Sequence, residues 1–355
     1  MAPDYLCGVV EGFYGRSWDW ADRGGYASFL PRVGLNTYVY APKSDACLRT
    51  NWAKPWSDSE LAALSSCARQ FAGQGVTFGI GISPIGLAGR PSRQQLADLQ
   101  VKLEQMASVS TSLWCILFDD VPSSGADMAS CQAYLYDRIR SVGSPERIIV
   151  CPSYYSTDPV LEKLFGPRPP DYWRELGKAL DSDVDFFWTG ERVCSDDYSK
   201  ENLESIADQM QRLPVLWDNY PVNDGAKASR FLHLDPYSGR HAFLGSYTAG
   251  HLANPMNQPW LSRLPLATLS SVVTGAKYEQ RLHAWDAMIQ ELMPDDVDRF
   301  RKDAAVFSAR GLEDFTRQEK DSLVAYYATV ESPAAVELVA WLREEYAFDP
   351  ACLTG

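Results

Sequence analysis

The sequence has few histidines and no closely spaced cysteine pair, which argues against the usual metal-binding motifs. Its four histidines form no HxxxH or HExxH motif, and its eight cysteines form no CxxC. A zinc site is therefore not expected, and no cofactor is predicted. Cys7, Cys115 and Cys151 lie in or beside apolar runs, where a free thiol behaves as a small hydrophobic group. We predict reduced thiols rather than disulfides.

The chain also lacks a basic cluster and a long apolar run. Its net charge is −13 and its pI is near 4.8, which argues against nucleic acid as a partner. No apolar run reaches the roughly 18 residues of a membrane span, and "MAPDYLCGVV" lacks the basic and apolar regions of a signal peptide. We expect a soluble, cytoplasmic protein without a membrane partner, and both a monomer and a homodimer stay open.

What the sequence does contain is enough apolar material for a large core. Hydrophobic residues make up 46% of the 355 residues and charged residues 22%, so the chain is expected to be globular. Short apolar runs rich in β-branched and aromatic residues alternate with amphipathic stretches. Most of these runs are continuously apolar, which is the pattern of parallel strands covered on both faces. The predicted strands are 5–12, 36–42, 77–83, 114–119, 147–153, 184–190, 214–219 and 242–247.

Helical periodicity fills the gaps between the predicted strands. It is clear at 57–71, 92–106 and 199–213, where apolar residues recur on one face. Eight strands alternating with helices predict an α/β fold, a (β/α)8 TIM barrel. The competing doubly wound sheet would carry a GxGxxG motif after its first strand, which this sequence lacks.

The strand pattern stops near residue 278, and only helical patterns follow, at 283–292 and 332–346. The sequence therefore predicts two domains. A catalytic barrel spans 1–277, and a small C-terminal helical domain spans 278–355.

In a barrel of this kind, functional groups gather at the carboxyl ends of the strands. Those positions hold carboxylates, amides, phenols, tryptophans and one lysine, and they contain no Ser-His-Asp set. Aromatic platforms together with groups that grip hydroxyls suit a sugar ring. The polar and aromatic positions at the predicted strand ends include Glu11 to Tyr14, Lys43, Asp119-Asp120, Tyr154-Tyr155, Trp188-Thr189, Trp217 to Tyr220, Asp224, His251 and Asn254.

The adjacent Asp119 and Asp120 indicate a particular kind of sugar chemistry. Two neighbouring carboxylates fit poorly as nucleophile and acid on opposite sides of one glycosidic bond. They fit better if a 2-acetamido group of the substrate supplies the nucleophile. One carboxylate then orients the amide while the other protonates the leaving oxygen, and repulsion within the pair favours retention of one proton.

Seven segments in order resemble one known family, glycoside hydrolase family 84, the O-GlcNAcases and related β-N-acetylglucosaminidases, in a bacterial-type form. The resemblance runs from about residue 8 to 260 and departs from the family at Ser17, Leu48 and Tyr154. The matching segments are "GVVEGFYGRSWDW", "GLNTYVYAPKSD", "WCILFDDV", "CPSYYS", "FFWTGERV", "VLWDNYPVND" and "ANPMNQPW".

The resemblance implies retaining, substrate-assisted hydrolysis of terminal β-linked N-acetylglucosamine through an oxazoline, with a β-GlcNAc-bearing glycoprotein or glycan as substrate. Asp119 would polarise the acetamido nitrogen, and Asp120 would act as general acid and base. Tyr155 would donate a hydrogen bond to the attacking acetamide oxygen. Asn219 would help to fix the acetamide and the first aspartate.

The resemblance also implies a set of sugar-binding residues. Asp224 would hold the 4- and 6-hydroxyls, Asn254 would add a bond at the same edge, and Lys43 with the Gly12 carbonyl would hold the 3-hydroxyl side. The remaining predicted binding residues are Trp217 and Tyr14 as pocket walls, and Phe13 between Gly12 and Tyr14.

Other functions stay open from the sequence. One is an inactive GlcNAc-binding protein on the same barrel, which retention of both aspartates and Tyr155 disfavours. Another is a metal-dependent enzyme that uses Asp119 and Asp120 as ligands, which the lack of histidine and carboxylate partners disfavours. The natural aglycone is also open, between Ser/Thr of a glycoprotein and a glycan or cell-wall fragment, as is the choice between GlcNAc and GalNAc.

Overall fold

A computed structural model describes residues 4–87, 91–109, 111–119, 127–143 and 145–348. The strands are β1 (Leu6–Glu11), β2 (Thr37–Tyr40), β3 (Thr77–Ile82), β4 (Leu113–Leu117), β5 (Arg147–Cys151), β6 (Asp185–Trp188), β7 (Val215–Asp218) and β8 (Gly250–Ala253). The α-helices are α1 (Trp20–Arg32), α2 (Asp58–Gly73), α3 (Arg93–Ser108), α4 (Met128–Gly143), α5 (Pro159–Phe165), α6 (Tyr172–Ala179), α7 (Lys200–Met210), α8 (Leu244–Tyr247), α9 (Pro259–Leu266), α10 (Leu269–Val273), α11 (Tyr278–Leu292), α12 (Val297–Ala309), α13 (Arg317–Tyr327) and α14 (Pro333–Leu342).

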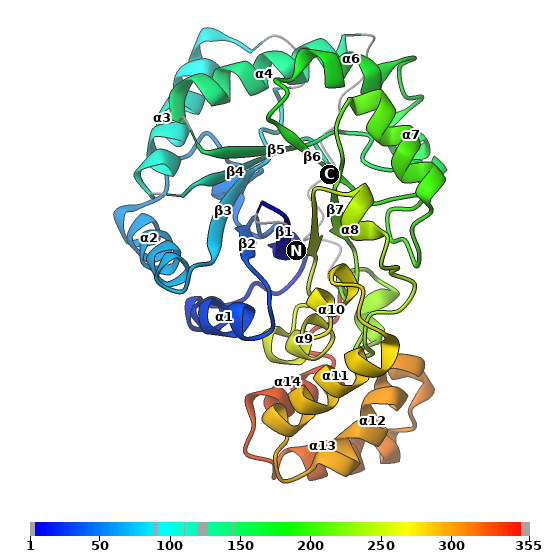
Figure 1. The fold of residues 1–355 in the computed structure, drawn as a ribbon. Helices are drawn as coiled ribbons and strands as arrows, with labels where there is room; N and C mark the ends of the chain where they lie inside the picture. The colour runs from blue at the N-terminus through cyan, green and yellow to red at the C-terminus, as the bar shows by residue number, and fades with distance from the viewer. Residues whose placement is uncertain (1–3, 88–90, 110, 120–126, 144, 349–355) are drawn as a thin grey trace.

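The strands close into a parallel barrel in sequence order, with β8 hydrogen-bonded to β1. Helices surround the barrel (Figure 1), so each strand is covered from outside while its other face fills the barrel interior. All residues of β1 and β4 are buried, as expected for continuously apolar parallel strands. The predicted (β/α)8 fold is confirmed.

The predicted helices begin where capping residues allow them to. Ser57 accepts a hydrogen bond from the backbone N–H of Glu60, and the Glu60 carboxylate accepts one from the Ser57 backbone. Ser92 and Gln95 repeat this capping box at the start of α3. Such boxes satisfy backbone donors that an α-helix leaves unpaired at its first turn. The helices predicted at 57–71, 92–106 and 199–213 are confirmed as α2, α3 and α7.

The eighth predicted strand is wrong. Residues 244–247 of the predicted strand 242–247 form the single turn α8, and the eighth strand is β8, at 250–253. β8 is short and contains no β-branched residue, but it pairs with β7 on one side and β1 on the other. An added Cβ at Gly250 would lie 2.9 Å from the Leu6 carbonyl oxygen. Close strand pairing, rather than intrinsic propensity, therefore specifies this segment.

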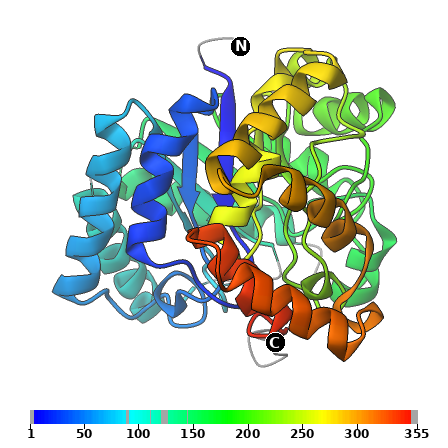
Figure 2. The same ribbon diagram turned by 90° about the horizontal axis from the view of Figure 1, so that it is seen from below.

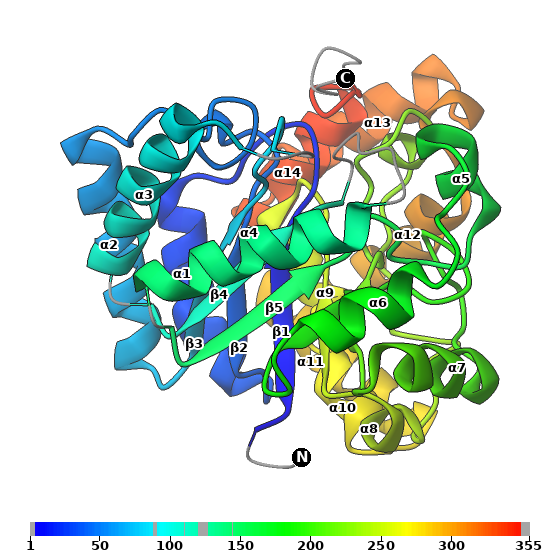
Figure 3. The same cartoon turned by 90° about the horizontal axis from the view of Figure 1, so that it is seen from above.

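The four helices α11 to α14 follow the barrel, and α11 and α14 pack against α9 (Figures 1 and 2). Figure 3 shows α14 near the end of the barrel toward which β1 runs. The strands all precede α11, but the division into domains at residue 277 stays a prediction. Within the described residues, none of the helices combines the length and apolar character that crossing a membrane requires, and no disulfide joins two of the described cysteines.

A buried ion pair fixes the end of β1 to the first helix. The Arg23 guanidinium donates to both carboxylate oxygens of Glu11, at 2.9 Å and 2.7 Å, and both side chains are almost fully buried. Charge and geometry together offset the loss of hydration that burial imposes. Glu11 is therefore a structural residue directly before the loop that enters the functional region.

The consequence of breaking this pair can be measured against an exposed pair on the same helix. Arg23→Met should lower the free energy of unfolding by about 3–5 kcal/mol, because it leaves the Glu11 carboxylate buried without its cation. Arg32→Met, which removes the exposed pair with Glu291, should cost less than about 1 kcal/mol. Urea denaturation of both variants tests this, and equal losses would contradict it.

Candidate active site

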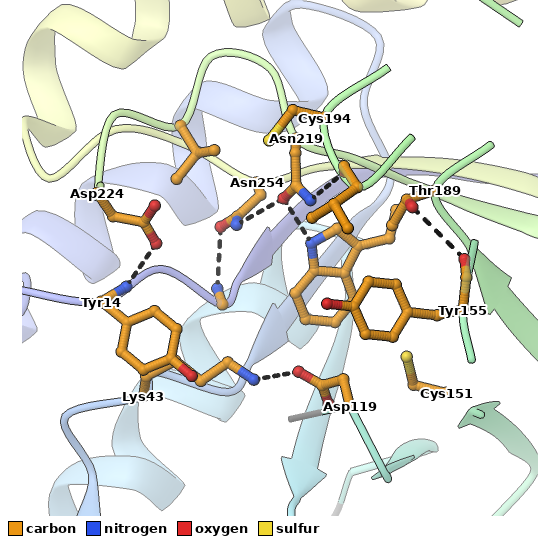
Figure 4. A pocket seen from close by; sticks show the side chains of 14 residues that line it. Tyr14, Lys43, Asp119, Cys151, Tyr155, Thr189, Cys194, Asn219, Asp224 and Asn254 are labelled. Atoms are coloured by element: carbon orange, nitrogen blue, oxygen red, sulfur yellow. Dashed lines mark hydrogen bonds and ion pairs between the residues drawn. The ribbon is translucent and has the colours of Figure 1, made fainter. Parts of the chain in front are cut away.

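A cavity of about 140 Å³ opens at the carboxyl end of the barrel. Among the described residues, the ends of all strands other than β3 contribute to its lining. Figure 4 shows the side chains converging from these strand ends. The described lining residues are Gly12, Tyr14, Lys43, Asp119, Cys151, Tyr155, Thr189, Val193, Cys194, Trp217, Asn219, Val222, Asp224 and Asn254.

An ion pair between Lys43 and Asp119 crosses the floor of this cavity (Figure 4). The Lys43 ammonium bonds to Oδ2 of Asp119, and its nitrogen lies 5.8 Å from the ring centres of both Tyr14 and Trp217. The second oxygen, Oδ1 of Asp119, is buried and has no hydrogen-bond partner among the described residues. A buried acceptor in this state is costly, so Asp119 is poised to accept a hydrogen bond from a ligand.

The loop after β1 forms one wall. The Tyr14 backbone N–H donates to Asp224 at 2.8 Å, and the Arg49 guanidinium donates to the Tyr14 hydroxyl at 2.9 Å. A Cβ added at Gly12 would lie 2.2 Å from the Trp217 ring. Only glycine at position 12 therefore allows the indole of Trp217 to lie against the backbone here.

A chain of amide hydrogen bonds joins three strand ends. The Gly12 N–H donates to Asn254, at 3.2 Å, and the Asn254 amide donates to the Asn219 carbonyl oxygen, at 3.0 Å. The Trp217 indole N–H donates to the same oxygen, at 3.1 Å, while the Asn219 amide donates to the Val193 carbonyl, at 2.8 Å. These hydrogen bonds hold Asn219 to its neighbours rather than to Asp119. They also fix the pocket wall before any ligand binds.

A buried charge cluster lies directly behind this wall. Asp218, between Trp217 and Asn219 in sequence, accepts hydrogen bonds from Arg240 at 2.6 and 2.9 Å and is 2.8 Å from Nε2 of His251. Burial alone would raise the pKa of Asp218, but the charge of Arg240 and the hydrogen bonds from His251 and Arg240 outweigh it and lower this pKa to about 2. His251, predicted to follow the eighth strand, lies within β8.

Arg240 extends this cluster to the loop after β6. Its guanidinium also donates to the backbone carbonyls of Ser195 and Asp196, at 2.9 Å and 2.6 Å. The same loop carries the lining residues Val193 and Cys194. One buried cation therefore holds both the end of β7 and the adjoining loop of the pocket.

The structure brings together most of the residues that the sequence singled out. All predicted site residues line the cavity except Phe13 and Asp120. Phe13 is wrong as a pocket residue, because its ring is buried in the core, 5.5 Å from the Trp18 ring. Asp120, the predicted general acid, lies outside the described residues.

Five lining residues were given no predicted role. Thr189, which follows β6, was among the strand-end positions, and Cys151 ends β5, so the strand-end rule could have selected it too. Val193, Cys194 and Val222 lie in loops, where the sequence gives no periodicity from which a side chain's direction could be inferred. Among the described residues, no group of three or more His, Cys, Asp or Glu side chains is arranged to hold a metal ion.

The closed barrel and this pocket define the class of protein: a (β/α)8 barrel whose aromatic walls, carboxylates and amides are typical of a site for a sugar-sized ligand. Comparison with known proteins then gives the family. A family model described as beta-N-acetylglucosaminidase matches residues 7–307, which is most of the chain. The chain belongs to this family, glycoside hydrolase family 84.

Individual relatives agree with this assignment. The protein O-GlcNAcases of Rattus norvegicus and Mus musculus are each 31% identical over 266 residues, which covers 72% of this chain. The aligned region spans only 28% of each of those proteins. A solved mutant of the Thermobaculum terrenum O-GlcNAc hydrolase is 28% identical, with a TM-score of 0.74, covering 96% of this chain and 81% of that one.

A second solved structure, CpGH84B, supports the fold. It is 22% identical, with a TM-score of 0.78, and the match covers 96% of this chain and 66% of that one.

The lowered pKa of Asp218 predicts how acid destabilises the protein. A folded-state pKa of about 2, below the value near 3.9 of an unfolded chain, stabilises the fold above pH 3.9 by about 2 kcal/mol, and this contribution is lost as the pH falls toward 2. The difference in unfolding free energy between the wild type and Asp218→Asn should therefore shrink between pH 5 and pH 2. Exposed Asp298→Asn is the control. A difference independent of pH would contradict the assignment.

Proposed function

We propose that this protein is a retaining β-N-acetylglucosaminidase that removes terminal β-linked N-acetylglucosamine with the help of the substrate's own acetamide. The observation that carries the proposal is the state of Asp119. Lys43 holds one of its oxygens, and the other is buried in the cavity without a hydrogen-bond partner among the described residues. An amide N–H of the substrate is the donor that this oxygen needs.

The proposed reaction has two steps. In the first, Asp119 accepts the acetamide N–H, which makes the acetamide oxygen a better nucleophile toward carbon 1. The bond from carbon 1 to the leaving oxygen breaks as Asp120 gives that oxygen its proton, and an oxazoline forms. In the second, Asp120 removes a proton from water as the water oxygen attacks carbon 1. Asp119 returns to the acetamide nitrogen the proton that it took in the first step, so the ring reopens with net retention.

The other lining residues are proposed to bind the sugar. Tyr155 extends into the cavity (Figure 4) and would donate its hydroxyl to the acetamide oxygen. Asp224 and Asn254 would bind the hydroxyls at carbons 4 and 6, and Trp217 with Tyr14 would cover the apolar faces of the ring. The family resemblance predicts that Lys43 binds the 3-hydroxyl, but the Lys43 ammonium donates a hydrogen bond to Asp119. We therefore propose that its main role is to orient that carboxylate.

The substrate class is proposed from the relatives. Proteins named protein O-GlcNAcase and O-GlcNAc hydrolase are among them. We therefore propose GlcNAc attached to Ser or Thr of proteins as the substrate of this chain.

The two aspartates are proposed to have different roles. Substrates with poor and with good leaving groups distinguish these roles. Asp120→Asn should lower kcat/KM by about 10²- to 10⁴-fold for an alkyl β-N-acetylglucosaminide, because the poor leaving group needs the acid. For a dinitrophenyl glycoside, the first step should change by less than about tenfold. Steady-state kinetics on both substrates measures this, and equal losses on both would show that Asp120 is not the acid.

Two further variants complete the experiment. Asp119→Asn should slow both substrates by a similar factor, because acetamide attack is needed whatever the leaving group. Asp197→Asn changes one member of another Asp-Asp pair, exposed and beside His241, and should leave both rates unchanged. No hydrolysis of either glycoside by the wild type would refute the proposed function itself.

A further inference from the structure

A second cavity, of about 580 Å³, lies next to the proposed sugar pocket. We call it the lateral cavity. It lies between the loop after β1, the start of α9 and the C-terminal helix α14, with the residues that flank that helix. Figure 2 shows α14 beside the end of the barrel toward which β1 runs.

One side chain holds the loop that lies between the two cavities. The Asn257 amide donates to the carbonyl oxygens of Tyr14, at 2.8 Å, and of Arg16, at 3.1 Å. Tyr14 lines the sugar pocket, whereas Arg16 and Asn257 line the lateral cavity. Two residues of extended chain span only about 7 Å, so the two cavities lie close together along this loop.

The lateral cavity is strongly acidic. Asp19, Glu331 and Glu345 are exposed lining residues, and Asp22 is half-buried. Among the described lining residues, Arg16 is the single cation. The side chains of Glu331 and Glu345 are exposed and form no hydrogen bond or ion pair with the described residues, so their charges face solvent.

A fifth carboxylate, that of Glu337, has a different role. It is buried and accepts hydrogen bonds from the backbone N–H groups of Trp260 and Leu261, both at 2.9 Å. It thereby caps the start of α9 and fixes α14 to the barrel. Burial raises the pKa of Glu337 to about 8, so it adds little negative charge at neutral pH.

Aromatic walls complete the lateral cavity, and the protein's own cations already lie against them. The Arg16 guanidinium lies 5.1 Å from the centre of the Tyr346 ring, and that of Arg263 lies 3.7 Å from the Trp260 ring. Aromatic faces near carboxylates attract Lys and Arg side chains through cation–π and ionic contacts together. The walls are therefore suited to a cationic side chain with an apolar stem.

We propose that the lateral cavity binds a lysine or arginine of the polypeptide that carries the sugar, a few residues from the glycosylated Ser or Thr. This inference rests on the proposed function and adds a preference within the substrate class. Charge complementarity and the shared wall with the sugar pocket support it. An acidic surface next to the site also attracts basic polypeptides over long distances, an effect that salt screens.

The test uses the full chain and three substrates. Two are synthetic GlcNAc-peptides that differ only in their flanking residues, lysine in one and glutamate in the other, placed two to four positions on each side of the glycosylated serine. The third is an aryl β-N-acetylglucosaminide, which has no polypeptide. The test variant is Glu331→Gln with Glu345→Gln, and the matched control is exposed Asp137→Asn with Glu204→Gln, on α4 and α7.

The wild type should prefer the lysine peptide, and this preference should decline as salt is added. The test variant should lower kcat/KM for the lysine peptide by about 5- to 20-fold, mainly through KM. It should leave the aryl substrate unchanged, which also demonstrates that the variant folds. The control variant should leave all three substrates unchanged.

Several results would overturn the proposal in distinguishable ways. Equal kcat/KM for the two peptides, or an equal effect of the test and control variants, would refute the binding of a basic side chain in the lateral cavity. Hydrolysis of the aryl substrate would still uphold the proposed function in that case. No hydrolysis of the aryl substrate would refute the proposed function and this inference together.

Discussion

The ion pair between Lys43 and Asp119 is the interaction on which the proposed site depends. It joins the ends of β2 and β4 across the mouth of the barrel, and both side chains are almost completely buried. Two charges in such surroundings are tolerated because each satisfies the other. The pairing uses only one oxygen of Asp119 and leaves the other without a hydrogen-bond partner among the described residues, and we propose that a ligand amide supplies it. A solvated aspartate would have many hydration partners and no such preference.

The pocket wall opposite this pair is held by charges that never reach the ligand. Asp218, Arg240 and His251 lie behind Trp217 and Asn219, and Arg240 also holds the loop that carries Val193. A buried charge cluster has few alternative arrangements, because every displaced partner leaves an uncompensated charge. The pocket wall is therefore held in place before a substrate binds. The free energy of substrate binding need not be spent on ordering this wall.

Much of the fold could be predicted from the sequence, because parallel strands buried on both faces leave continuous apolar runs such as the one before Asp119. The eighth strand could not, since "GHLA" has little strand propensity and is specified by its two neighbours. The strand-end rule selected Lys43, Asp119, Trp217 and Asn254, and these residues line one cavity.

Other features of the site depend on three-dimensional contacts that no local pattern encodes. The Lys43–Asp119 pair joins residues far apart in the chain. The inward turn of Phe13 toward Trp18 depends on core packing, and the loop residues Val193 and Cys194 follow no regular period. The roles of the individual residues, including Asp120, stay proposals.

The most direct test of the central claim is the response of the rate to fluorine on the substrate's acetyl group. Aryl N-acetylglucosaminides carrying zero to three fluorine atoms on that group differ mainly in how well the amide oxygen can attack carbon 1. If Asp119 activates that oxygen, kcat/KM must fall progressively with each added fluorine. A rate that does not change across the series would show that the acetamide is not the nucleophile, and would contradict this account of the site.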